Sequence, residues 1–169
     1  MSTRPTTPYS HNLGDRDPLV AIRESTEQIR AMTSTWLPEL FERSYAAGKW
    51  PARLVLTHLA QTELALGTRA RMALTVPGYV AQPFDQDAWM VRESGMTGRT
   101  AADVFLAVAG MNRVFFEGLS AADREMTLSH PEYGRLTVDW IIYQLAGHQI
   151  HHLLQLEEVR ISILLASHF

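Results

Sequence analysis

The stretch Gly147-His148-Gln149-Ile150-His151-His152-Leu153-Leu154-Gln155 decides how this sequence is interpreted. It lies in a long helical pattern whose apolar stripe is defined without any histidine by Ile141, Leu145, Leu156 and Val159. Steps of three and four residues from Leu145 reach His148 and then His152, so both should face the core with Cβ atoms about 5–6 Å apart. Two imidazoles so placed can chelate one divalent metal ion. His151 lies about 100° further round the helix, on its flank.

A third histidine belongs to an earlier helical pattern. Residues 51–74 carry an apolar stripe that includes Val55, Leu59 and Thr62, and His58 lies on or beside that face. Three imidazoles from two packed helices would form an open three-nitrogen metal site, with the remaining positions left for water or substrate. From periodicity alone, the alternative of hydrogen-bonded core histidines stays open.

The remaining pattern predicts an all-α protein. Helices are expected at about 17–37, 51–74, 101–118 and 137–165, with Asp17, the Thr100–Asp103 pair and Thr137 as N-terminal caps. The segment 38–49 is open between helix and loop, 75–99 is a long connection, and 119–136 holds at most one short helical turn near Ser120 and Asp123. No window shows strand alternation. Four helices joined by short and long connections favour a four-helix bundle, with residues 1–16 as a flexible arm and 17–169 as one domain.

The amino-acid composition argues against several classes of function. The 169 residues carry 15 Lys and Arg against 18 Asp and Glu, a net charge of -3, and this balance argues against nucleic-acid binding. There is no cysteine, which excludes disulfides, a protein thiolate nucleophile and a cysteine zinc site. The polar N-terminus does not have the pattern of a signal peptide, and no stretch is long and apolar enough for a membrane span. We therefore expect a cytoplasmic protein that does not bind membranes.

Two motifs resemble those of the DinB/YfiT-like superfamily. One is Gly48-Lys49-Trp50-Pro51 followed by His58-Leu59-Ala60-Gln61-Thr62-Glu63, and the other is His148-x-x-His151-His152-x-x-Gln155. The resemblance covers about residues 17–165. It implies an antiparallel-type four-helix bundle with a long connection between the second and third helices, and a metal triad of His58, His148 and His152. The region of Asp85, Asp87 and Trp89 also resembles a loop element of one subfamily.

What the resemblance implies about the reaction is broader. Relatives include transferases and isomerases that use low-molecular-weight thiols, and others described as metal-dependent hydrolases. A divalent ion held by three neutral histidines can bring the pKa of bound water to about 7 or deprotonate a bound thiol, so the triad alone does not separate these reactions. Zinc or nickel is the expected ion, and a low-molecular-weight thiol is a possible second cofactor, because the chain has no sulfur nucleophile of its own.

Supporting residues are less well defined by the sequence. Gln144 and Gln155 are one helical turn from His148 and His152 and could hold the imidazoles in place, while His151 and Trp89 could line a pocket. Glu63 is about 140° from His58 round its helix and is not favoured as a base. The spacing of Asn112 and Glu117 does not decide whether they face the cavity, so the general base stays unassigned.

The leading hypothesis is a metal-dependent enzyme, a hydrolase or a thiol transferase, that acts on a small-molecule substrate. The alternatives are a metal-holding bundle that binds or senses without turnover and a metal-free helical dimer. We expect a homodimer in solution, because bundles of this kind often leave apolar surface uncovered.

Overall fold

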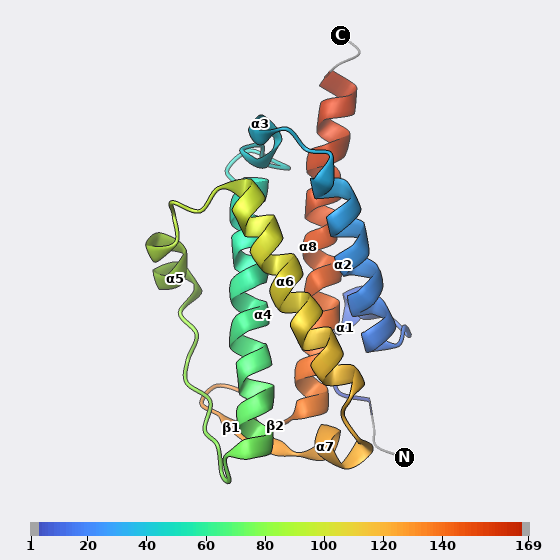
Figure 1. The fold of residues 1–169 in the computed structure, drawn as a ribbon, viewed down its shortest axis with the longest axis vertical. Coiled ribbons are helices and arrows are strands. Elements are labelled where there is room, and N and C mark those ends of the chain that lie inside the picture. Colours follow the sequence, from blue (N-terminus) through green and yellow to red (C-terminus); the bar gives the residue numbers. More distant parts are fainter. Residues whose placement is uncertain (1–3, 167–169) are drawn as a thin grey trace.

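Four long helices form the bundle, as predicted (Figure 1). The computed structural model describes the backbone of residues 4–166 and side chains as far as Ile161; residues 1–3 and 167–169, at the ends of the expected arm and domain, lie outside it. The long helices are α2 (Pro18–Ser34), α4 (Ala52–Thr75), α6 (Gly98–Glu117) and α8 (Val138–Ala166). The short elements are α1 (Ser10–Leu13), α3 (Pro38–Phe41), α5 (Gln86–Arg92), α7 (Ala121–Glu125), β1 (Thr127–His130) and β2 (Gly134–Thr137). The all-α fold class is confirmed.

The helix starts follow from local capping. The Asp17 carboxylate accepts hydrogen bonds from the Leu19 and Val20 amides at 2.9 Å, and Thr137 Oγ1 accepts one from the Trp140 amide at 3.0 Å. The start predicted for α6 was wrong. Thr97 is the N-cap and its hydroxyl accepts from the Thr100 amide, so α6 begins at Gly98 rather than near residue 101.

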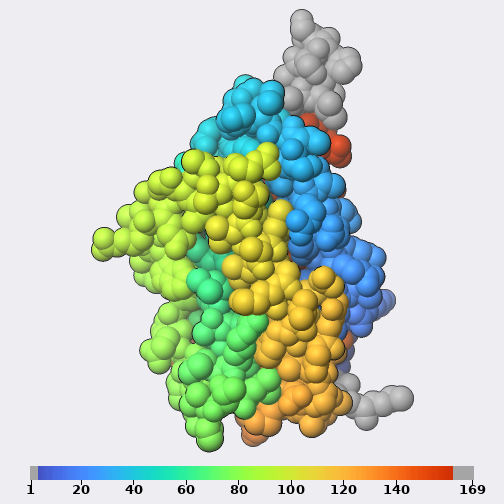
Figure 2. All heavy atoms as spheres, viewed as in Figure 1, coloured from blue at the N-terminus to red at the C-terminus, as the bar shows by residue number. Residues whose placement is uncertain are grey.

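The bundle is not antiparallel throughout. Figure 1 shows α4 and α6 running in one direction and α2 and α8 in the other. This arrangement requires the connection 76–97 to travel back along the length of α4 before α6 can begin. The connection holds α5, whose cap Asp85 accepts from the Ala88 amide. Figure 2 shows its atoms covering one flank of the molecule beside α4.

A small β-hairpin closes one end of the bundle, where no strand was predicted. β1 and β2 pair antiparallel, with buried Leu128 opposite buried Leu136. Strands of four residues are too short to show a recognisable alternation. The Ser129 backbone also exchanges hydrogen bonds with Tyr79 and Ala81, which ties the hairpin to the connection 76–97.

The N-terminal segment packs against the bundle, where the sequence predicted a flexible arm. Leu13 of α1 is buried, and the Trp140 indole N–H donates to the Thr6 carbonyl at 3.0 Å. At Gly147 a Cβ would collide with the backbone and side chain of Tyr9, so only glycine lets the segment lie this close to α8.

A buried polar layer divides the core into two apolar clusters. One cluster, nearer the hairpin, includes Phe116 and Ile141, and the other includes Phe105 and Leu156. Between them each long helix contributes buried polar side chains, namely Ser25, Thr26, His58, Gln61, Thr62, Glu63, Asn112, His148, Gln149 and His152. Among residues 4–166 no helix has the length and apolar character needed to cross a bilayer.

Candidate metal centre

The structure brings the three predicted histidines together in this layer. His58 Nε2 lies 2.9 Å from His148 Nε2, which lies 3.1 Å from His152 Nε2. All three side chains are buried, and their nearest ring nitrogens lie within 4.8 Å of one another. We call these residues the histidine cluster. The one-turn spacing on α8 and the antiparallel packing of α4 against α8 are sufficient to produce this convergence.

Burial keeps these imidazoles neutral. It lowers the pKa of His58 to about 4, with a smaller contribution from His151. It lowers the pKa of His152 to about 3, and neighbouring His58 adds to this effect. Burial also places the pKa of His148 well below its ordinary value. Neutral imidazole is the form that binds a metal ion, so the cluster is ready to coordinate one near pH 7.

Hydrogen bonding alone does not satisfy the histidine cluster. A neutral imidazole offers one N–H donor and one acceptor nitrogen, yet His148 Nε2 faces two other Nε2 atoms at once. His58 Nδ1 is buried and has no hydrogen-bond partner among the described residues. In a tetrahedral site with Zn–N bonds of 2.0–2.1 Å, nitrogens lie about 3.3 Å apart, close to the 2.9 Å and 3.1 Å that separate His148 Nε2 from the other two Nε2 atoms. The residues therefore fit a divalent metal ion.

Gln155 has the position expected of a supporting residue. Its Oε1 lies 2.7 Å from His152 Nδ1, and its Nε2 lies 3.4 Å from the Tyr45 hydroxyl and 3.2 Å from His151 Nε2. Such a contact fixes the orientation of the ring and the nitrogen that carries the proton. His151 is half-buried on the flank and packs 5.2 Å from the Tyr9 ring, centroid to centroid.

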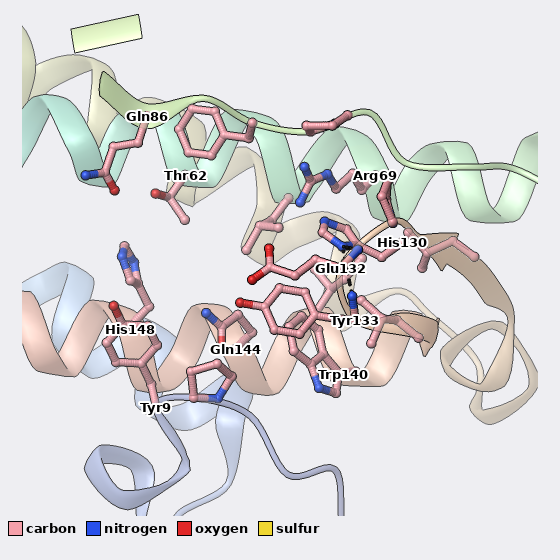
Figure 3. Close-up of a pocket in the computed structure, with 18 of the residues that line it drawn as sticks. Tyr9, Thr62, Arg69, Gln86, His130, Glu132, Tyr133, Trp140, Gln144 and His148 are labelled. Carbon is pink, nitrogen blue, oxygen red and sulfur yellow. Dashed lines mark hydrogen bonds between the residues drawn. The ribbon is translucent and has the colours of Figure 1, made fainter. Parts of the chain in front are cut away.

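A pocket of about 560 Å³ opens from the histidine cluster toward the hairpin (Figure 3). His58 and His148 line one end of it, and Thr62 and Gln144 follow one turn away on α4 and α8. The buried Thr62 Oγ1 and Gln144 Oε1 have no hydrogen-bond partner among the described residues. Gln144 thus lies beside the site without contacting an imidazole. Its Oε1 atom and Thr62 Oγ1 are both available to a ligand.

Trp89 does not line this pocket. It is 36% exposed on α5 and packs edge-on against Phe84, which lines the pocket together with Pro83 and Gln86. Glu117 is also outside the pocket, where it pairs with Arg113 on the surface of α6. The sequence pattern had left the orientation of Glu117 undecided.

Glu63 and Asn112 belong to a second buried group, which we call the carboxyl cluster: Glu63, Asn112, Gln149 and Ser25. Glu63 accepts from Gln149 Nε2 at 2.6 Å and from Asn112 Nδ2 at 2.7 Å. Ser25 Oγ lies 2.5 Å from Gln149 Oε1, and Arg71 donates to Asn112 Oδ1. Burial raises the pKa of Glu63, whereas the two amide donors act to lower it. Glu63 does not line the pocket.

Several residues of the site were missed by sequence reasoning. Tyr9 lines the pocket, and its ring packs edge-on against His148 at 5.0 Å. Arg69 lines the pocket three turns beyond His58, and the hairpin supplies His130. For Tyr9 the available signal was Gly147, because a glycine inside a helix often marks a close approach by another group.

Known proteins resemble this chain in sequence and fold. A protein of Oceanobacillus iheyensis, described as a "putative metal-dependent hydrolase", is 28% identical over 116 residues, which are 68% of this chain and 67% of that protein. The solved structure of YfiT from Bacillus subtilis, described as "a probable metal-dependent hydrolase with an unusual four-helix bundle topology", matches with a TM-score of 0.77 at 16% identity and covers 96% of this chain and 93% of YfiT.

A second solved structure is a mycothiol-dependent maleylpyruvate isomerase, with a TM-score of 0.70 at 15% identity. The match covers 92% of this chain and 63% of the isomerase. At these identities the two solved structures establish the fold. The sequence model of the DinB superfamily matches residues 21–156, a span that contains most of the four-helix bundle and all three histidines. This chain belongs to the DinB superfamily.

Proposed function

We propose that this chain is a metal-dependent enzyme in which His58, His148 and His152 hold one divalent ion, zinc or nickel. The observation that carries the proposal is the convergence of three neutral, buried imidazoles, two of which, His58 and His148, line one end of a pocket. When bound, the ion would act as a Lewis acid and lower the pKa of a coordinated water or small thiol.

The chain's own residues would position the reacting molecules. Gln155 orients the His152 ring through its 2.7 Å contact with Nδ1. Gln144 and Thr62, whose buried oxygens lack partners among residues 4–161, would hydrogen-bond the substrate near the triad. The Tyr9 ring covers His148 on the side of the N-terminal segment and limits access of water there.

Both hydrolysis and thiol transfer fit this arrangement. The description of the Oceanobacillus relative supports hydrolysis, and the fold shared with a mycothiol-dependent enzyme supports the use of a small thiol. The chain contains no cysteine, so any nucleophilic sulfur would come from a bound low-molecular-weight thiol. A dependence of turnover on added thiol would separate the two reactions.

Metal content tests the proposal first. The full chain should be purified without a nickel column and measured by mass spectrometry beside a His148→Ala/His152→Ala variant. We expect near-stoichiometric metal in the wild type and its loss in the variant. If neither protein holds zinc or nickel when the ions are supplied, the metal-dependent mechanism is wrong. Metal without turnover in hydrolase and thiol-transfer screens would instead indicate a binding protein.

A further inference from the structure

The pocket has a chemically distinct far end. Along α4 it is lined by His58, Thr62, Leu66 and Arg69, and along α8 by His148, Gln144, Ile141 and Trp140. Because α4 and α8 run antiparallel, both sets of residues, in the order given, lead away from the histidine cluster toward the hairpin. Along the two helices the lining therefore changes from polar residues beside the triad to apolar Leu66 and Ile141, and then to the cation Arg69.

Arg69 has unused hydrogen-bonding capacity at this far end. Its Nη2 donates to the Gln82 carbonyl at 2.6 Å, and within the described part of the chain it forms no ion pair. A guanidinium has five N–H donors and stays charged at neutral pH. A half-buried cation that lines a pocket and forms no ion pair favours an anionic ligand.

The helix sets the distance between the two ends. Eleven residues separate His58 from Arg69, which is about 16 Å of helix rise, and about three full turns place both on the same face of α4. We propose that the pocket takes an elongated, amphiphilic carboxylate: its carboxylate pairs with Arg69, its apolar body lies against Leu66 and Ile141, and its other end faces His58 and His148. The inference rests on the proposed function only where it places the other end of the ligand at the histidines, because the contact with Arg69 does not require a metal ion.

Glu132 narrows the class of anion. It enters the same pocket from the hairpin and makes no ion pair with Arg69 among the described residues (Figure 3). A dianionic phosphate would meet stronger repulsion from Glu132 than a carboxylate would, and one guanidinium matches one negative charge. A planar carboxylate can also accept two parallel hydrogen bonds from the guanidinium. The site is therefore best suited to a monocarboxylate.

Two probes of equal length test the inference, octanoate and octanol. The full chain is titrated with each while the indole N–H signals of its four tryptophans are followed by NMR, because Trp140 lines the pocket. We expect octanoate to bind about tenfold more tightly than octanol, since a charge-assisted hydrogen bond contributes at least that factor. In Arg69→Met the preference should fall to about twofold or less, and Arg69→Lys should retain part of it.

The controls separate a charge effect from a loss of structure. Arg69→Met also loses the bond to Gln82, so unchanged octanol binding would show that the pocket is intact, and equal weakening of both probes would overturn the inference. Glu132→Gln should bind octanoate at least as tightly as the wild type. A preference that persists in Arg69→Met would also overturn it.

The experiments can refute the proposed function and the role of Arg69 independently of each other. A carboxylate preference in a wild-type protein that binds neither zinc nor nickel when the ions are supplied would support the role of Arg69 and refute the metal-dependent reaction. A zinc-loaded protein with no carboxylate preference would refute the role of Arg69 and leave the metal centre standing.

Discussion

The histidine cluster and the carboxyl cluster lie in the same buried layer, yet they satisfy their hydrogen bonds differently. In the carboxyl cluster each Glu63 oxygen accepts an amide N–H, and the amide oxygens of Asn112 and Gln149 accept from Arg71 and Ser25. In the histidine cluster three nitrogens of one kind face each other, and His58 Nδ1 has no partner among the described residues. A completed network stabilises the fold, whereas an incomplete one at the wall of a pocket indicates a ligand.

The largest effect is expected from Glu63→Leu. It leaves one donor of Gln149 and one of Asn112 buried without an acceptor, and each such donor costs about 1–3 kcal/mol, so the free energy of unfolding should fall by about 2–6 kcal/mol. Urea unfolding followed by circular dichroism measures this. Glu117→Gln, which removes an exposed pair with Arg113, should change the stability by less than about 0.5 kcal/mol. Similar losses in both variants would mean that the carboxyl cluster has no special role.

The two clusters also respond to pH in opposite directions in metal-free protein. The histidines have lower pKa values folded than unfolded, so below about pH 6.5 the unfolded state binds more protons and stability is lost as the pH falls toward 4. Glu63 has a raised pKa, so its contribution to stability is lost as the pH rises.

The acid loss from His58 alone is on the order of 3 kcal/mol, given about 1.4 kcal/mol per pKa unit. Urea midpoints measured between pH 4 and 7 with a chelator present should therefore fall less steeply in His58→Leu than in the wild type. Identical slopes in the two proteins would contradict a buried, neutral His58.

Gln155→Ala tests how the histidine cluster is supported. Losing the contact with His152 Nδ1 should weaken zinc binding by about 10–100-fold, as measured by competition with a chelating dye. Leu154→Ala provides a matched control, because Leu154 is 48% exposed on the same helix. Unchanged zinc affinity in Gln155→Ala would remove this glutamine from the site.

The smallest effect should come from Gly67→Ala. The added Cβ would collide with the Asn112 side chain and disturb the carboxyl cluster, lowering stability by about 1–2 kcal/mol. Gly110→Ala on α6 meets no atom within 4 Å and should instead stabilise the helix by about 0.5–1 kcal/mol. Thermal unfolding of the two variants should therefore shift in opposite directions.

The difference between the clusters also explains what could be predicted from the sequence. His148 and His152 continue an apolar stripe that other residues define, so periodicity located them, and the stripe of α4 located His58. Gln149 and Glu63 lie off those stripes, and their burial depends on how α2 and α6 pack, which periodicity within one helix does not reveal.

The remaining features depend on contacts between distant parts of the chain. Tyr9 reaches the site because a short N-terminal helix docks at Gly147, and composition alone made that segment look loose. The hairpin that completes the pocket has strands of four residues, below the length at which alternation is visible. The position of Arg69 beyond His58 was calculable from helix geometry, but its significance depends on a pocket that tertiary packing creates.

The separation of His58 and His148 by 90 residues sets the order in which the centre can be assembled during synthesis. At about 5–20 residues per second, a ribosome needs about 5–18 s to add the chain between them. During that interval α4 has been made, with its apolar face and its single histidine, but α8, which packs on that face and supplies the other two histidines, has not. The nascent chain must therefore reach α8 before three imidazoles can converge, so a divalent ion that needs all three histidines would bind only after α8 has been made.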